Sequence, residues 1–63
     1  MNKEQKELIK NVIMERIDNI ATLSRLQEEY RNNEADDDVA WAIDKINKRE
    51  KEIKTLLDLL IGE

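Results

Sequence analysis

The spacing of the apolar residues is the feature that most constrains how this chain can fold. Apolar side chains recur at steps of three and four residues, which is the period of one face of a helix. The chain has no proline and a single glycine, so little in it would interrupt a helix. Strand signals are absent, because no run alternates between apolar and polar residues.

Two segments carry this helical period. In the second half the series is a regular heptad pattern with one polar position, made of Val39, Ile43, Ile46, Glu50, Ile53, Leu57 and Leu60. In the first half the matching series has two polar interruptions and consists of Ile9, Ile13, Arg16, Ile20, Leu23, Gln27 and Tyr30. The sequence therefore predicts two long helices, each with one continuous apolar seam.

The break between the helices is predicted within RNNEADDD, residues 31–38. Asn32 can end the first helix in a left-handed conformation, and Asn33 can cap the second, with Asp36 in the capping-box position. We expect helices over about 3–31 and 34–61, with a turn at about 32–33. The fold is then all-α: residues 1–63 form one domain, an antiparallel two-helix hairpin with coiled-coil-like packing.

The register of this hairpin can be predicted from its two charged exceptions. Folding the chain near residue 33 places Ile20 opposite Ile46 and also brings Arg16 opposite Glu50. A polar pair inside a seam costs stability but fixes register, so we predict Arg16 and Glu50 as the register pair. The alternative is a long parallel coiled-coil dimer in which both charged side chains extend outward to solvent.

The small size of the chain favours association with another chain. A chain of 63 residues buries only about 60% of its unfolded surface and usually needs a disulfide, a metal or a partner. Cysteine and histidine are both absent, which excludes disulfides and thiolate metal sites and disfavours zinc or copper sites. Beside the seam runs a second apolar strip, the candidate dimer face: Leu8, Val12, Leu26, Ala42, Leu56 and Leu59. We expect a homodimer that forms a four-helix bundle through this strip.

Catalytic groups and cofactor motifs are not found in the sequence. Ser24, Thr22 and Thr55 lie on predicted helices without a base nearby, and Gly62 cannot form a phosphate loop alone. Contiguous acids such as Asp36 and Asp37 point about 100° apart on a helix and cannot converge on one metal ion. We therefore predict no catalytic residue, no cofactor and no metal site, and expect a protein that is not an enzyme.

The three consecutive aspartates, Asp36, Asp37 and Asp38, have a structural explanation. The helix dipole favours carboxylates in a first helical turn, each by about 0.3–1 kcal/mol. A calcium loop instead spaces its acids alternately and turns at a glycine, which this segment lacks. We interpret the cluster as the start of the second helix.

Trp41 is predicted opposite the seam, beside Lys45 and Lys48, and largely exposed. Three interpretations stay open: packing over the lysine stems, an anchor for a partner protein, or burial in a higher oligomer. Trp41, Lys45 and Lys48 are therefore the candidate residues for binding a partner.

These features together favour a small interaction protein that docks a helical face on an unidentified partner protein. The richness in Ile, Lys, Asn and Glu is common in AT-rich bacterial and phage genomes and indicates such an origin. The spare apolar strip, the outward Trp41 and the absence of catalytic groups favour a regulator or inhibitor. No apolar run approaches the roughly 20 residues of a membrane span, and no signal-peptide core is seen. We expect a cytoplasmic protein that does not bind membranes.

Two other functions compete with this hypothesis. In length and helix plan the chain resembles the Rop-type plasmid copy-control proteins, and that resemblance implies a dimeric bundle that binds paired RNA loops. Lys3, Lys6 and Lys10 could supply a basic face, but the aromatic residue that this family uses on its first helix has no counterpart here. The third class is a structural assembly element. We favour a protein partner over nucleic acid.

Overall fold

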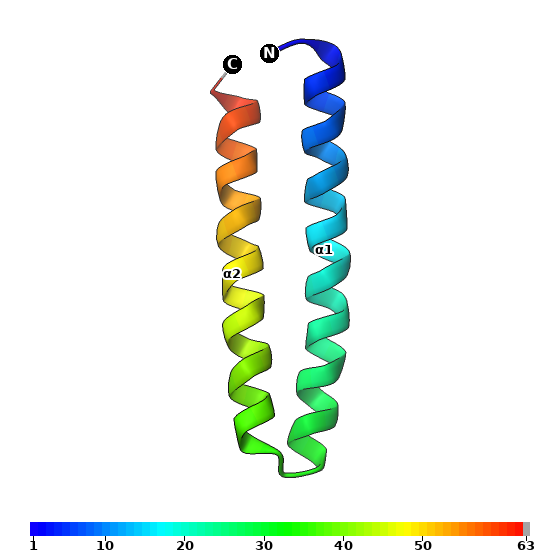
Figure 1. The fold of residues 1–63 in the computed structure, drawn as a ribbon, viewed down its shortest axis with the longest axis vertical. Helices are drawn as coiled ribbons and strands as arrows, with labels where there is room; N and C mark the ends of the chain where they lie inside the picture. The colour runs from blue at the N-terminus through cyan, green and yellow to red at the C-terminus, as the bar shows by residue number, and fades with distance from the viewer. Residues whose placement is uncertain (63) are drawn as a thin grey trace.

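The computed structural model describes residues 1–62 and shows two antiparallel helices joined by a short turn (Figure 1). Helix α1 spans Lys3–Asn32 and helix α2 spans Asp36–Ile61. The hairpin measures 47 × 15 × 10 Å between its Cα extremes, and the start of α1 lies beside the end of α2, away from the turn (Figure 1). The predicted all-α hairpin is confirmed.

Helix α1 begins with a capping box that the sequence analysis did not identify. The side chain of Asn2 accepts a hydrogen bond from the backbone N–H of Gln5 at 2.8 Å. The side chain of Gln5 accepts one from the backbone N–H of Asn2 at 3.1 Å. The two bonds satisfy donors that have no partner inside a helix, and the spacing Asn-x-x-Gln is a readable signal for them.

The turn is a Schellman motif, in which the backbone rather than a side chain closes the end of α1. Asn33 is the C-cap, the N–H of Glu34 donates to the carbonyl of Arg31 at 3.2 Å, and the N–H of Ala35 donates to the carbonyl of Tyr30 at 2.9 Å. The left-handed residue is Glu34, with φ of 57°. This 6→1 and 5→2 bonding is the pattern that defines the motif.

The roles predicted for Asn32 and Asn33 at the helix ends are therefore wrong. Asn32 is the last residue of α1, and α2 begins at Asp36 with Ala35 as an N-cap that makes no side-chain bond. Neither Asn32 nor Asn33 has a positive φ. The connection is longer than predicted, because the Schellman motif needs a left-handed residue after the C-cap and one more residue before the next helix.

Glu34 is a position where glycine should stabilise the fold. The left-handed conformation costs an L-residue about 1–2 kcal/mol, and glycine avoids this cost but loses more chain entropy on folding. We expect Glu34→Gly to raise the free energy of unfolding by up to about 1 kcal/mol in urea denaturation followed by circular dichroism. Glu34→Ala removes the same carboxylate but keeps the strain, so it should give no gain. Equal stability of the two variants would contradict this account.

The interface between the helices is narrow. Of the described residues only Ile13 and Ala42 are buried, with 9% and 0% of their surface exposed, and no large side chain is fully buried. The other apolar residues that line the interface are half-buried: Ile9, Val12, Ile20, Leu23, Leu26, Val39, Ile46, Ile53, Leu56 and Leu60. Such a thin core is what a two-helix hairpin alone can provide.

Helix α2 is rotated relative to the predicted seam. Ile43 and Leu57, which the heptad pattern placed inside, are exposed, and their neighbours Ala42 and Leu56 turn toward α1 instead. The side chain of Ala42 is completely covered, so this position favours a small residue over a large one such as isoleucine. The rotation also moves Glu50 out to solvent, which avoids placing a carboxylate in the seam.

Candidate interaction face

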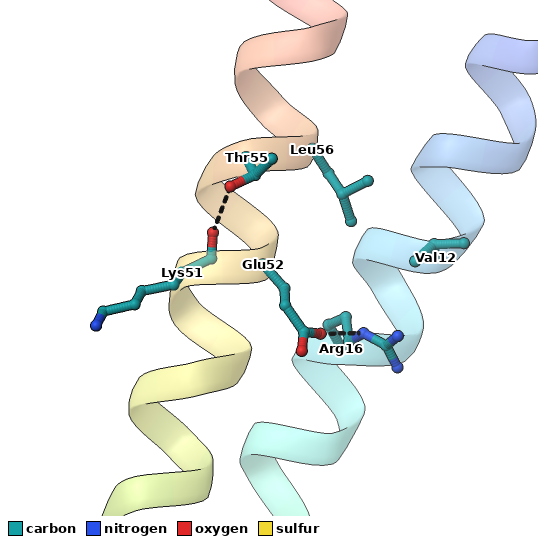
Figure 2. A pocket seen from close by; sticks show the side chains of 6 residues that line it. All are labelled: Val12, Arg16, Lys51, Glu52, Thr55 and Leu56. Carbon is teal, nitrogen blue, oxygen red and sulfur yellow. Dashed lines mark hydrogen bonds and ion pairs between the residues drawn. The ribbon is translucent and has the colours of Figure 1, made fainter.

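A charged cluster at the middle of the hairpin shows the register of the helices. Arg16 on α1 forms an ion pair with Glu52 on α2, with 2.6 Å between Nε and Oε2 (Figure 2). Arg49, one helical turn before Glu52, donates through Nη1 to both of its carboxylate oxygens at 2.8 and 3.1 Å. Two guanidinium groups therefore share one carboxylate, which leaves the cluster with one excess positive charge.

The predicted register pair of Arg16 and Glu50 is wrong. Glu50 is exposed and lies beside Lys51 and Lys54 on the outer side of α2. The acid opposite Arg16 is two residues further along, because the turn is longer than predicted and displaces α2 relative to α1. The spacing of three residues between Arg49 and Glu52 is a helical pairing signal that could have indicated this acid.

The Arg16–Glu52–Arg49 cluster acts on register more than on stability. The side chains of all three residues are still about one-third exposed, and ion pairs in such positions contribute about 0–1 kcal/mol. The Nε atom of Arg16 is buried and ion-paired, yet no acceptor among the described residues lies in hydrogen-bonding geometry to its N–H. A slipped register would separate this guanidinium from Glu52, so the cluster opposes slippage.

Beside the cluster the two helices form a shallow groove, shown in Figure 2. Val12 from α1 and Leu56 from α2 line it and are directed toward one another across the gap (Figure 2). Arg16 and Glu52 close one end of the groove. The groove therefore combines an apolar wall with a charged end.

Trp41 lines a second groove, further toward the turn. Its neighbours there are Asn19 and Leu23 from α1 and Lys45 and Arg49 from α2. The predicted place of Trp41, opposite the seam, is thus wrong. The rotation of α2 that brings Ala42 inward carries Trp41 to the flank, where it remains exposed but lies next to α1.

The three candidate residues for binding a partner are only partly brought together. Lys45 is half-buried and shares the groove with Trp41. Lys48 lies further out, exposed, with its ammonium 3.0 Å from the carboxylate of Asp44. The structure therefore assigns Trp41 and Lys45 to one groove and Lys48 to its outer edge.

Both grooves open on the same side of the hairpin. On α1, Val12, Asn19 and Leu26 follow one another at seven-residue steps and so share a flank. The flank of α2 that carries Trp41 and Leu56 lies beside it. We call this side the Trp41 face and define it by its apolar residues, Leu8, Val12, Leu26, Trp41, Leu56 and Leu59.

The Trp41 face contains five of the six residues of the predicted dimer face. Leu8 and Leu59 are exposed, and Val12, Leu26 and Leu56 are half-buried at the edge of the seam. Ala42 does not belong to it, because its side chain is fully covered within the hairpin and cannot reach another chain. Trp41 takes its place as the large side chain near the turn.

The other polar groups of interest are occupied or dispersed. The hydroxyls of Thr22 and Thr55 donate to the carbonyls of Asp18 and Lys51, at 3.2 and 3.0 Å, within their own helices. The acidic residues 36–38 lie in the first turn of α2, where they complement the helix dipole. Across residues 1–62, no three potential metal ligands come together. What the described surface offers is apolar contact and charge.

No protein-family model matches the chain, and comparison with curated proteins and with solved structures finds no significant match. Neither helix in the described part of the chain is long and apolar enough to cross a membrane. The function is therefore inferred from the Trp41 face.

Proposed function

We propose that the protein is a non-enzymatic interaction module that acts by docking its Trp41 face on another protein. In the absence of that partner, the same face pairs two copies, which gives a homodimeric four-helix bundle. The observation that carries the proposal is the exposure of Leu8, Trp41 and Leu59 on one side of a hairpin whose own core is thin.

Covering this face would supply the stability that the hairpin core lacks. Full burial of a leucine or similar side chain gains about 1.5–3 kcal/mol, and Leu8 and Leu59 are both mostly exposed in the single hairpin. Small helical proteins often reach a stable fold by such association. Burial by another chain is therefore both the driving force for docking and a condition for a stable fold.

The composition of the face suits a specific contact. Tryptophan and arginine are the residues most often found as energetic anchors at interfaces, and Trp41 and Arg49 line the same groove. The Arg16–Glu52–Arg49 cluster lies between the apolar ends of the face, where charges contribute selectivity more than affinity. A small helical hairpin with these properties suits a regulator or inhibitor of bacterial or phage type.

A matched pair of substitutions on α1 tests this function. Leu8 and Met14 are both 64% exposed, but Leu8 belongs to the Trp41 face and Met14 points away from it. We expect Leu8→Lys to weaken self-association at least tenfold in sedimentation equilibrium, because it places an ammonium group in an apolar contact, whereas Met14→Lys should leave it unchanged.

The same variants serve as baits for capture from bacterial lysates. A protein retained by the wild type and by Met14→Lys, but lost with Leu8→Lys, binds through the Trp41 face. If the wild type is a helical monomer, or if both substitutions weaken association equally, the proposed use of this face is wrong.

A further inference from the structure

We infer that the second copy covers the Trp41 face in the antiparallel sense, with its turn at the opposite end of the bundle. This inference rests on the proposed homodimer and adds its geometry. A copy with its turn at the same end would also bring apolar residues together, so the choice between the two arrangements depends on charge.

The charge of the hairpin is concentrated at its turn. Residues 21–40 contain two bases and six acids, Arg25, Arg31, Glu28, Glu29, Glu34, Asp36, Asp37 and Asp38. Their net charge of −4 equals that of the whole chain, so the remaining residues are neutral in sum. The opposite end is neutral in sum, with Lys3, Lys6, Lys10 and Lys54 against Glu4, Glu7, Asp58 and Glu63.

This distribution favours the antiparallel arrangement. Helices packed side by side lie about 8–10 Å apart, which is close to the Debye length of about 8 Å at physiological salt. Two turns at the same end would therefore still repel one another, with the repulsion reduced by salt but not abolished. In the antiparallel arrangement they are separated by nearly the 47 Å length of the hairpin, and each lies near the neutral end of the other copy.

The apolar residues of the face are also placed symmetrically about its middle. On α1, Leu8 and Leu26 each lie nine residues from Ile17; on α2, Trp41 and Leu59 each lie nine residues from Glu50. Ile17 and Glu50 lie at nearly the same level, because Arg16 is paired with Glu52. A single two-fold axis at this level therefore superposes the level of Leu8 on that of Leu26, and the level of Trp41 on that of Leu59.

Such an axis produces matched contacts along the face. It places Leu8 opposite the partner's Leu26 and Trp41 opposite the partner's Leu59. The face is thus complementary to itself when it is turned end for end.

The face is also large enough for a stable dimer. The side of the hairpin that carries the face measures 47 by 15 Å between Cα extremes, a projected area of about 700 Å², which is comparable with the roughly 800 Å² that each partner buries in a standard interface.

Distance measurement between spin labels tests the arrangement. The chain has no cysteine, so one introduced cysteine gives one label per copy. Asn33→Cys places the label in the exposed turn, and Asp18→Cys, the control, places it on the exposed side of α1 near its middle. For the antiparallel dimer, double electron–electron resonance should give a distance near the 47 Å hairpin length for residue 33. For residue 18 the distance should be on the order of 20 Å.

The possible outcomes test the antiparallel arrangement and the homodimer separately. A short distance at both positions would show a dimer with both turns at one end, which overturns the antiparallel arrangement and leaves the dimer in place. Absence of any distance between copies at both positions, with a monomer in sedimentation, would overturn the arrangement and the proposed homodimer together.

Discussion

Replacing Ala42 with leucine is expected to lower the free energy of unfolding by about 1–3 kcal/mol. Ala42 is completely covered, so a larger side chain at this position would have to displace the residues packed on it. Three additional carbon atoms would force the helices apart or the side chain into a strained rotamer. A hairpin of this size has a total stability of only about 3–5 kcal/mol, so the loss should be visible as partial unfolding.

The measurement is urea denaturation followed by circular dichroism at one fixed protein concentration, because association also affects stability. Ala40→Leu is the matched control, since Ala40 lies on the same helix and is exposed. Leucine and alanine have similar helix propensities, so this control should change stability little. If Ala42→Leu is as stable as Ala40→Leu, Ala42 does not lie between the helices.

Replacing Ile13 with alanine is expected to have the largest effect of any single truncation, about 2–4 kcal/mol. Among the described residues, Ile13 is the one large apolar side chain that is buried, with 9% of its surface exposed. The substitution removes three carbon atoms from the centre of a core that has few others to compensate. The variant should be largely unfolded at room temperature.

Ile17→Ala provides the comparison, because it removes the same atoms one helical turn away from a side chain that is 52% exposed. We expect it to cost less than about 1 kcal/mol. Thermal denaturation of the two variants, followed by the helical signal at equal concentration, should separate them by many degrees. Equal melting temperatures would show that α1 does not direct Ile13 toward α2.

The helical period of the apolar residues was sufficient to predict the hairpin, but it could not predict the rotation of α2. Apolar residues occur there as adjacent pairs, such as Ala42 with Ile43 and Leu56 with Leu57. Either member can face the seam without changing the period, so the pattern does not distinguish them. The choice depends on the distance between the backbones, which is a property of the packed pair.

The residues of the turn and of the charged cluster were predicted incorrectly for a related reason. Asparagine is the usual non-glycine residue in left-handed positions, yet the backbone bonds of the Schellman motif place Glu34 there. The resulting longer connection changes the register, and Arg16 meets Glu52 in place of Glu50. A turn one residue longer than predicted thus shifts the register by two residues along the whole length of the helices.

The turn also determines the order in which the hairpin forms. Next to it the contacting residues of α1 and α2 are close in sequence, whereas Leu8 and Leu59 lie at the two ends of the chain. The entropy lost on closing a loop grows with its length, so contacts are expected to form first beside the turn and to extend toward the termini. In the antiparallel pair, the turn of each copy, which forms first, would pack against the end of the other copy that forms last. Assembly would then complete the folding of both chains.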